Sequence, residues 1–505
     1  MSDSREGKSL FARTAHGAGW MVAWRATTRI LGLASTLILV RLLEPGDFGL
    51  IALAASFVLV VDAFSFIGAE DSLVREKNPS DALLNTAFTL NVLRACASAL
   101  VVAALAVPAA TFFDEPRLTS VILLLAAATA LEGFSNIGTV AFRRSMAFEK
   151  EFRLQILPRL AGVIVGVTCA VILQNHWALV AGVLVQRVLR VGFSYAMHPF
   201  RPSFSLQEWR SIAAFSVWAW AIMVALQIRE RSESIIIGRL LGTTYVGIYD
   251  TGKEIALLPT SELVHPACHA AYSAFAQSRN DGDHPGDACL RVMGLLTLVS
   301  LPAGFGLSLI AAPLVRLAFG PQWLEAIPVI QALGIAGAFA VFGIVCGTLL
   351  RAHGLMRVSF RMTLIGTPVR ILILLVVIPW GGLQAAAIAV AGVLIASRFG
   401  TLFVTFRHFH IPLSSCLTRV WRSLAAVAVM ALALWWSGLG WTPRPPDSIV
   451  ACALQIAESV SLGASVYVAV VVGLWLACGR PAGGEADALA IARRMLDRVA
   501  ARLSR

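Results

Sequence analysis

Residues 41–50 read RLLEPGDFGL, and residues 239–248 read RLLGTTYVGI. Both stretches fit one pattern, in which an arginine and two leucines precede four variable positions, a Phe or Val, a glycine, and a Leu or Ile. Further matches follow in the same order along the chain: 181–185 with 391–395, Pro158-Arg159 with Pro368-Val369-Arg370, and Phe152-Arg153 with Phe360-Arg361. The sequence therefore predicts an internal repeat.

The composition is typical of an integral membrane protein. Of the 505 residues, 58% are hydrophobic and 14% are charged, whereas water-soluble proteins have about 25% charged residues. The eight cysteines form no CxxC or Cys/His cluster, so neither a metal site nor disulfides are expected. The polar start, MSDSREGKSL, lacks the pattern of a cleavable signal peptide. In such a chain, an internal repeat indicates a transporter built from two related halves.

Apolar runs of about 20 residues predict an all-α integral membrane protein with about 14 transmembrane helices. The expected spans are 18–42, 46–68, 82–108, 117–140, 154–174, 176–198, 211–238, 243–270, 289–312, 323–350, 357–379, 382–407, 418–438 and 448–478. The longest polar connection, 271–288, is read as a loop. The tail after these spans, ADALAIARRMLDRVAARLSR, is read either as a basic amphipathic helix on the inner leaflet or as a frayed tail.

Lysine and arginine distribute unevenly over the two sides of these spans. About 25 fall on the side that holds the N-terminus and about 5 on the other. Because cytoplasmic loops carry the excess of positive charge, both termini are expected in the cytoplasm. This distribution also explains the net charge of +12, so no nucleic-acid partner is expected.

The repeat and the orientation together predict the domain organisation. Arg41 ends the first expected span and Arg239 the seventh, and the six spans counted between them mean that the two halves point the same way. The expected parts are an N-lobe over 1–200, a C-lobe over 201–412, two appended helices over 413–480, and a basic cytoplasmic tail over 481–505.

Charged residues inside the expected spans are candidates for function, since a charge at the centre of a membrane helix costs about 2.5–3.5 kcal/mol. Such charges must either line a wet cavity or pair with one another. A central cavity is predicted around a mostly basic group: Arg25, Arg29, Asp62, Arg94, Arg159, Lys253 and Arg370. A cationic cavity suits an anionic passenger, because guanidinium groups match phosphate oxygens.

Other charges have simpler interpretations. Arg187, Arg190 and Arg398 lie near the cytoplasmic ends of their spans, where long side chains can reach the membrane surface. Arg229 and Glu233 are four residues apart and could pair with each other. His265, His269 and His353 do not have metal-ligand spacing.

Four motifs carry a resemblance to a known family: residues 41–49 (RLLEPGDFG), 236–242 (IIGRLLG), 112–116 (FFDEP) and 319–323 (FGPQW). In this order, across about residues 15–410, the chain resembles Wzx-type polysaccharide flippases. These belong to the multidrug/oligosaccharidyl-lipid/polysaccharide exporter superfamily.

The resemblance implies a two-lobed helical fold whose central cavity opens to one side of the bacterial cytoplasmic membrane at a time. The implied passenger is a polyprenyl-diphosphate-linked oligosaccharide, with Arg25 and Arg29 facing the cavity. Membrane lipids are implied contacts, and a polysaccharide polymerase and export proteins are candidate partners. No cofactor is expected. The membrane potential, H⁺ or Na⁺ could drive transport, with Asp62, Glu132 and Glu233 as ion-coupling candidates.

Alternative functions stay open at this stage. A multidrug exporter of the same superfamily is one, although an acidic cavity would suit cationic drugs better. A membrane polymerase or ligase of the polysaccharide pathway is another, but the expected external loops are short and contain no catalytic cluster. The third is a lipid scramblase or an assembly partner. A transporter rather than an enzyme is therefore the favoured interpretation.

Overall fold

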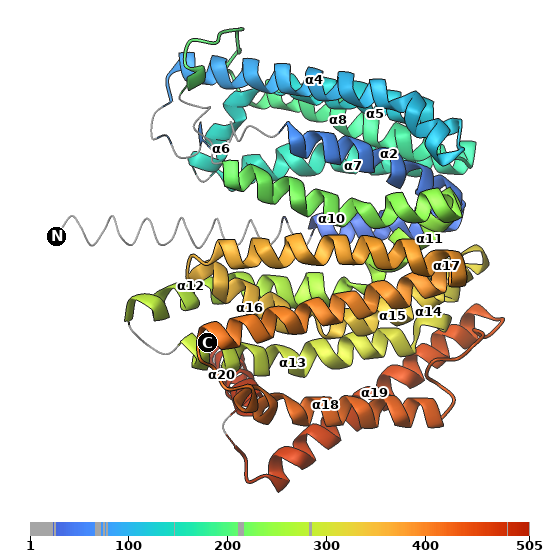
Figure 1. The fold of residues 1–505 in the computed structure, drawn as a ribbon, viewed down its shortest axis with the longest axis vertical. Coiled ribbons are helices and arrows are strands. Elements are labelled where there is room, and N and C mark those ends of the chain that lie inside the picture. The colour runs from blue at the N-terminus through green and yellow to red at the C-terminus, as the bar shows by residue number, and fades with distance from the viewer. Residues whose placement is uncertain are drawn as a thin grey trace. The chain divides into compact units, whose positions relative to one another are not determined.

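The computed structural model describes residues 24, 27–65, 72–73, 76, 79–145, 147–210, 217–281, 285–481 and 483–503. Within these residues the regular secondary structure is all helical and contains no strand. The prediction of an all-α chain is thus confirmed. Figure 1 shows long helices lying side by side, joined by short connections.

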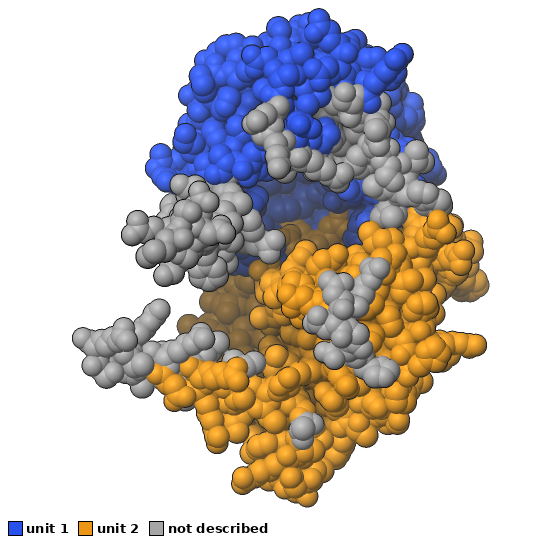
Figure 2. Space-filling model, turned by 90° about the vertical axis from the view of Figure 1, so that its left-hand side faces the viewer, with its two compact units in different colours: residues 1–247 blue, residues 248–505 orange. Residues whose placement is uncertain are grey.

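The chain divides into two compact units, Met1–Gly247 and Ile248–Arg505 (Figure 2). This division lies beyond the predicted lobe boundary at residues 200 and 201. The difference arises because α10 (Val217–Leu241), the first helix of the predicted C-lobe, packs against α2 (Pro45–Phe64) of the first unit. The division into lobes by sequence repeat stays a prediction.

Unit 1 is a helical bundle built around α2, α5, α8 and α7, each of which packs against the next. Helix α4 covers α5 and α2, and a helical stretch over residues 27–42 precedes α2. Besides α2 and α10, its helices are α4 (Asp81–Phe113), α5 (Arg117–Gly133), η1 (Ile137–Thr139), α6 (Val140–Arg144), α7 (Phe148–Leu173) and α8 (Trp177–Met197).

Unit 2 has a hydrophobic core formed by α12, α13, α16 and α18. Helix α11 (Thr243–Ala256) leads into it across the unit boundary. The remaining elements are η2 (Thr260–Val264), α12 (His265–Asp281), α13 (Pro285–Leu309), α14 (Ala311–Ala318), η3 (Pro321–Ala326), α15 (Ile327–Ala338), α16 (Ala340–Ala352), α17 (Met356–His408), α18 (Leu413–Trp436), α19 (Ile449–Ala477) and α20 (Gly484–Leu503).

Most described helices overlap the predicted spans. The predicted span over 243–270 is an exception, because it is divided among α11, η2 and α12, and none of these three is long and apolar enough to cross a membrane. Eight described helices are long and apolar enough to cross a membrane, or up to ten if each of two sharply bent pairs is one span. Helix α17 contains two predicted spans, because the chain turns at Gly382 with φ 57° and ψ −147°. Helix α10 is not among the helices apolar enough to cross a membrane, because it contains several charged residues. The first predicted span is only partly described. The protein is therefore a multi-pass membrane protein.

Two polar segments test the sequence predictions, and one of them differs from its expected structure. The predicted loop over 271–288 is wrong, because α12 continues to Asp281 and α13 begins at Pro285. Alanine-rich sequence favours the helix there, whereas the apolar run used to find spans does not extend that far. The tail is helical as α20 and packs on α13, so the frayed tail is excluded for its described part.

The two copies of the opening motif pack directly on each other. Gly49 and Gly247 are equivalent positions, as are Pro45 and Thr243. A Cβ on Gly49 would overlap the carbonyl oxygen of Thr243, and a Cβ on Gly247 would overlap that of Pro45. Such a reciprocal contact is expected around a two-fold axis. The repeat glycines therefore allow a close backbone contact that a side chain at either position would prevent.

Candidate functional site

One predicted cation approaches the first helix next to a second one in sequence. Arg159, on α7, places its Nη2 atom 2.8 Å from the position that a Cβ on Gly32 would occupy. Arg29 lies on that helix three residues before Gly32, and positions three residues apart are neighbours on a helix surface. Arg29 and Arg159 are both half-buried. Arg25, four residues earlier in the sequence, lies outside the described residues.

The predicted cation Arg94 pairs with the predicted coupling residue Asp62. Arg94 Nη1 lies 2.9 Å from Asp62 Oδ1, and the two side chains are 22% and 34% exposed. Asn91 Oδ1 accepts a second bond from Arg94 Nη2 at 3.2 Å, and Ser65 Oγ lies 3.5 Å from Nη1. The guanidinium is thus held between α2 and α4, and its charge is balanced within the bundle.

Glu132 on α5 binds two arginines of α8. Arg190 Nη1 lies 2.8 Å from Glu132 Oε1, and Arg187 Nη1 lies 3.1 Å from Oε2. Arg187 also donates to Thr129 Oγ1 at 3.0 Å. Both arginines had a simpler interpretation as residues reaching the membrane surface, and the structure instead joins them to a carboxylate on the neighbouring helix. Spacing along one chain segment could not have revealed this pairing.

The remaining predicted residues lie on α10, α11 and α17. Glu233 on α10 is fully buried, between the buried Ser232 and Ser234. Lys253 on α11 lies 5.9 Å from the centre of the Tyr249 ring. Arg370 on α17 is buried, with 7% of its surface exposed. That these residues line one central cavity stays a prediction.

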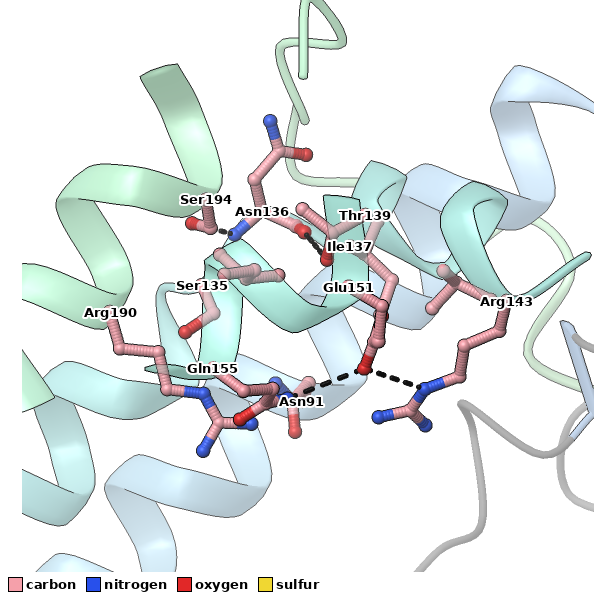
Figure 3. Close-up of a pocket in the computed structure, with 12 residues that line it drawn as sticks. Asn91, Ser135, Asn136, Ile137, Thr139, Arg143, Glu151, Gln155, Arg190 and Ser194 are labelled. Atoms are coloured by element: carbon pink, nitrogen blue, oxygen red, sulfur yellow. Dashed lines mark hydrogen bonds and ion pairs between the residues drawn. The ribbon is translucent and has the colours of Figure 1, made fainter. Parts of the chain in front are cut away.

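A small polar pocket lies inside unit 1, between α4, α7, α8 and the bend at η1 (Figure 3). Glu151 Oε1 accepts from Arg143 Nε at 3.1 Å and from Gln155 Nε2 at 3.4 Å. The volume of about 40 Å³ leaves room for a few waters, at about 10–15 Å³ each. It is far below the roughly 300 Å³ at which ligand sites begin, so the network serves to hold the helices.

A larger pocket lies in unit 2 between α12 and α16, with a volume of about 270 Å³. Its lining is His265, Cys268, His269, Tyr272, Ile344, Thr348 and Arg351. None of these residues is acidic. Sequence reasoning missed this site because it tested the histidines only for metal-ligand spacing. The signal was the helical spacing of His265, His269 and Tyr272, which places them on one face of α12.

Charged groups also hold the end of unit 1 where the repeat glycines meet. Asp47 Oδ1 accepts from the backbone N–H of His176 at 3.0 Å, and burial lowers the pKa of the His176 imidazole. Arg117 donates two bonds to Glu115, at 2.8 and 2.9 Å, and these bonds lower the pKa of the Glu115 carboxyl. Arg239 lies 5.3 Å from the Phe112 ring centre. These contacts join helix ends and thereby stabilise the bundle.

The fold and the charged residues within its helices define a class: multi-pass helical membrane proteins with ion pairs and basic groups placed between spans. The family model described as "Polysaccharide biosynthesis protein" matches residues 38–328, more than half of the chain. The chain belongs to this family.

Curated relatives span most of the chain at low identity. The chain is 26% identical over 408 residues to "Lipopolysaccharide biosynthesis protein WzxC" of Escherichia coli (strain K12), covering 79% of this chain and 81% of that protein. It is 25% identical over 320 residues to "Succinoglycan biosynthesis transport protein ExoT" of Rhizobium meliloti (strain 1021), covering 63% of this chain and 65% of that protein.

Solved structures share the fold. "Lipid II flippase MurJ, inward closed conformation" matches with a TM-score of 0.73 at 14% identity, over 91% of this chain and 99% of that chain. An inward-facing multidrug resistance MATE family transporter of the MOP superfamily matches with a TM-score of 0.59 at 14% identity, over 75% of this chain and 94% of that chain. At this identity the matches establish the architecture alone.

Proposed function

We propose that this protein is a flippase that moves a polyprenyl-diphosphate-linked oligosaccharide, a precursor of a surface polysaccharide, across the cytoplasmic membrane by alternating access. The observation that carries the proposal is membership of the polysaccharide biosynthesis family, together with a fold shared with a lipid II flippase. The name of the ExoT relative supports transport rather than catalysis.

Arg29 and Arg159 are the residues we propose for the diphosphate, together with Arg25, four residues before Arg29 in the sequence. The guanidinium group of Arg159 lies against the first helix at Gly32, three residues after Arg29. A diphosphate presents several oxygens, and each guanidinium can donate two parallel hydrogen bonds to it. Gly32 has no side chain, so it leaves space for Arg159 to approach the helix. Arg94, Lys253 and Arg370 remain predicted contributors to the same binding.

The drive for transport stays a proposal. Moving a charge across the membrane is worth about 2.3 kcal/mol per 100 mV, and this favours outward movement of an anion. Coupling to H⁺ or Na⁺ would use Asp62, Glu132 or Glu233. A proton on Asp62 would remove the charge that Arg94 pairs with, so protonation and release of Arg94 would be linked. We place both termini in the cytoplasm, and a polymerase and export proteins are the proposed partners.

One alternative has an observation in its favour. The fold match to a multidrug transporter makes drug export a second candidate. The carboxylates Asp62 and Glu132 are both engaged by arginines, which leaves fewer acidic groups to bind a cationic drug. We therefore rank drug export below flipping.

The experiment deletes the gene from its native host and restores it on a plasmid. Flipping predicts that deletion stops surface polymer and traps lipid-linked oligosaccharide where outer-face enzymes cannot reach it. Loss of a polymerase would instead leave single repeat units displayed outside, and loss of a drug exporter would change drug susceptibility with polymer intact. Either of these results would overturn the proposal.

The Arg29→Ala variant tests the binding residues in the same strain. We expect loss of polymer with a normal amount of protein, whereas Arg29→Lys should be milder because the positive charge remains. Arg357→Ala, an exposed arginine at the start of α17, is the matched control and should export normally. Full export by Arg29→Ala would remove Arg29 from the proposed site.

A further inference from the structure

The pocket of unit 2 is built by two helix faces. His265, Cys268, His269 and Tyr272 follow one another at i, i+3, i+4 and i+7 on α12. Ile344, Thr348 and Arg351 lie at i, i+4 and i+7 on α16. Helix α12 begins after the π-helical turn η2, where Thr260 Oγ1 donates to the carbonyl of Gly337 at 3.1 Å. π-helical turns occur frequently at functional sites. The anchored turn fixes the start of α12 against α15.

The charges at this pocket are all of one sign. Arg351 donates to Thr348 Oγ1 at 3.0 Å, and it forms no ion pair with any carboxylate in the described part of the chain. His265 interacts electrostatically with His269, with Arg351 of α16 and with Arg398 of α17. The side chains of His265, His269 and Arg351 are exposed enough to meet a ligand.

The equivalent arginine in unit 1 is neutralised. At the spacing that relates Phe152-Arg153 to Phe360-Arg361, Arg351 corresponds to Arg143 and Ser359 to Glu151. Arg143 Nε lies 3.1 Å from the buried carboxylate of Glu151. Ser359 has no charge to offer Arg351. The two copies of the repeat thus keep the arginine, and only the first copy keeps a carboxylate for it.

We propose that the pocket between α12 and α16 binds the phosphate group of an anionic ligand, which supplies the negative charge that Glu151 supplies in unit 1. Guanidinium and imidazolium N–H groups are strong donors to phosphate oxygens, and the Tyr272 hydroxyl adds a neutral donor. The volume of about 270 Å³ suits a head group and is small for an oligosaccharide. That the ligand is a polyprenyl diphosphate rests on the proposed function. That the pocket binds phosphate does not depend on the proposed function.

The test measures binding of inorganic pyrophosphate to the purified full-length protein by calorimetry. We expect Arg351→Gln to weaken binding by about tenfold or more. Ser359→Glu, which restores the carboxylate of unit 1, should weaken it similarly. His265→Ala/His269→Ala should also weaken binding, because two ring nitrogen donors are lost. Arg357→Gln and His408→Gln, outside the pocket, are the matched controls and should bind as wild type.

Several outcomes would overturn the site. These are absence of pyrophosphate binding, equal binding by Arg351→Gln and Arg357→Gln, or equal binding by the wild type and the variant that lacks both histidines. Farnesyl diphosphate is the second probe. If farnesyl diphosphate binds more tightly than pyrophosphate, a lipid-linked ligand is supported. If the two bind equally, that identity is overturned, while the phosphate site stands. A protein that exports polymer but binds no pyrophosphate would refute this inference and leave the proposed function intact.

Discussion

Arg143 in unit 1 and Arg351 in unit 2 occupy the same position of the repeat, yet their surroundings differ. Arg143 bonds to the buried Glu151 in a pocket of about 40 Å³. Arg351 faces His265 and His269 across a pocket of about 270 Å³ with no acidic lining residue. Both halves of the repeat therefore contain a cation at this position. Only unit 1 has a carboxylate, Glu151, where unit 2 has Ser359, and this difference decides what each cation can bind.

The two halves of the repeat also share a close backbone contact, on which both depend. Gly49 and Gly247 each press against the backbone of the other copy, so the scaffold depends on both in the same way. A common scaffold with different charges is what an asymmetric passenger requires. We test first the shared glycine contact and then the differences in charge between the two units.

The largest effect is expected from Gly49→Ala or Gly247→Ala. Each added Cβ would overlap a carbonyl oxygen, and neither backbone can move without shifting a helix. We expect a loss above about 4 kcal/mol, or failure to fold, for both variants. Thermal unfolding in detergent, followed by size-exclusion chromatography, measures it. Gly192→Ala, with nothing within 4 Å of its Cβ, is the control. A wild-type melting temperature for Gly49→Ala would contradict the shared contact.

The second largest effect is expected at Arg422, a cation of unit 2 that does pair with a carboxylate. Arg422 donates two bonds to Glu485, at 2.6 and 2.9 Å, and the side chains are 4% and 7% exposed. Glu485→Ala would leave a buried charge without its partner, and such losses cost about 3–5 kcal/mol. Thermal unfolding and protease release of α20 would report it.

Asp487→Ala is the matched control on the same helix. Asp487 pairs with Arg291, which is 69% exposed, and exposed pairs contribute about 0–1 kcal/mol. Equal destabilisation by the two substitutions would show that burial does not decide how strongly α20 is held.

A moderate effect is expected from Glu151→Gln. The substitution removes the charge that Arg143 pairs with and so makes unit 1 resemble unit 2. Loss of a hydrogen bond to a buried charged group should cost about 1–3 kcal/mol. Calorimetry should show no new pyrophosphate site, because the pocket is too small. Glu149→Gln, whose carboxylate is exposed, should be near neutral. A second binding site in Glu151→Gln would show that charge alone, without space, creates the anion site.

The smallest effect is a pH dependence at Glu115. Arg117 lowers the pKa of this carboxyl in the folded state, so its contribution is present above the ordinary pKa of about 4.3. It is lost as pH falls through the lowered folded value. The partly exposed pair should contribute about 0–1 kcal/mol. Melting temperatures between about pH 3 and pH 6 should fall less steeply in Arg117→Gln than in wild type. An unchanged slope would exclude this pair as a source of acid sensitivity.

The helices could be predicted from sequence because apolar runs of membrane length repeat along the chain, as in α4 and α19. The partners of charged residues could not. Asp62 and Arg94 were both identified as candidates, but their pairing depends on how α2 and α4 are rotated, which no local pattern records. The same holds for Glu132 with Arg187 and Arg190. The pocket at His265 was missed because the histidines were tested only for metal-ligand spacing, and their contact with α16 depends on how α12 packs against it.

Flipping of a lipid-linked oligosaccharide is the central claim, and it can be measured in proteoliposomes that contain only this protein. The substrate is placed in one leaflet, and its sugar is probed with a membrane-impermeant reagent on the other side. We predict that the protein makes the sugar accessible and that Arg29→Ala abolishes this while Arg357→Ala does not. Accessibility that is the same with and without the protein would contradict the account.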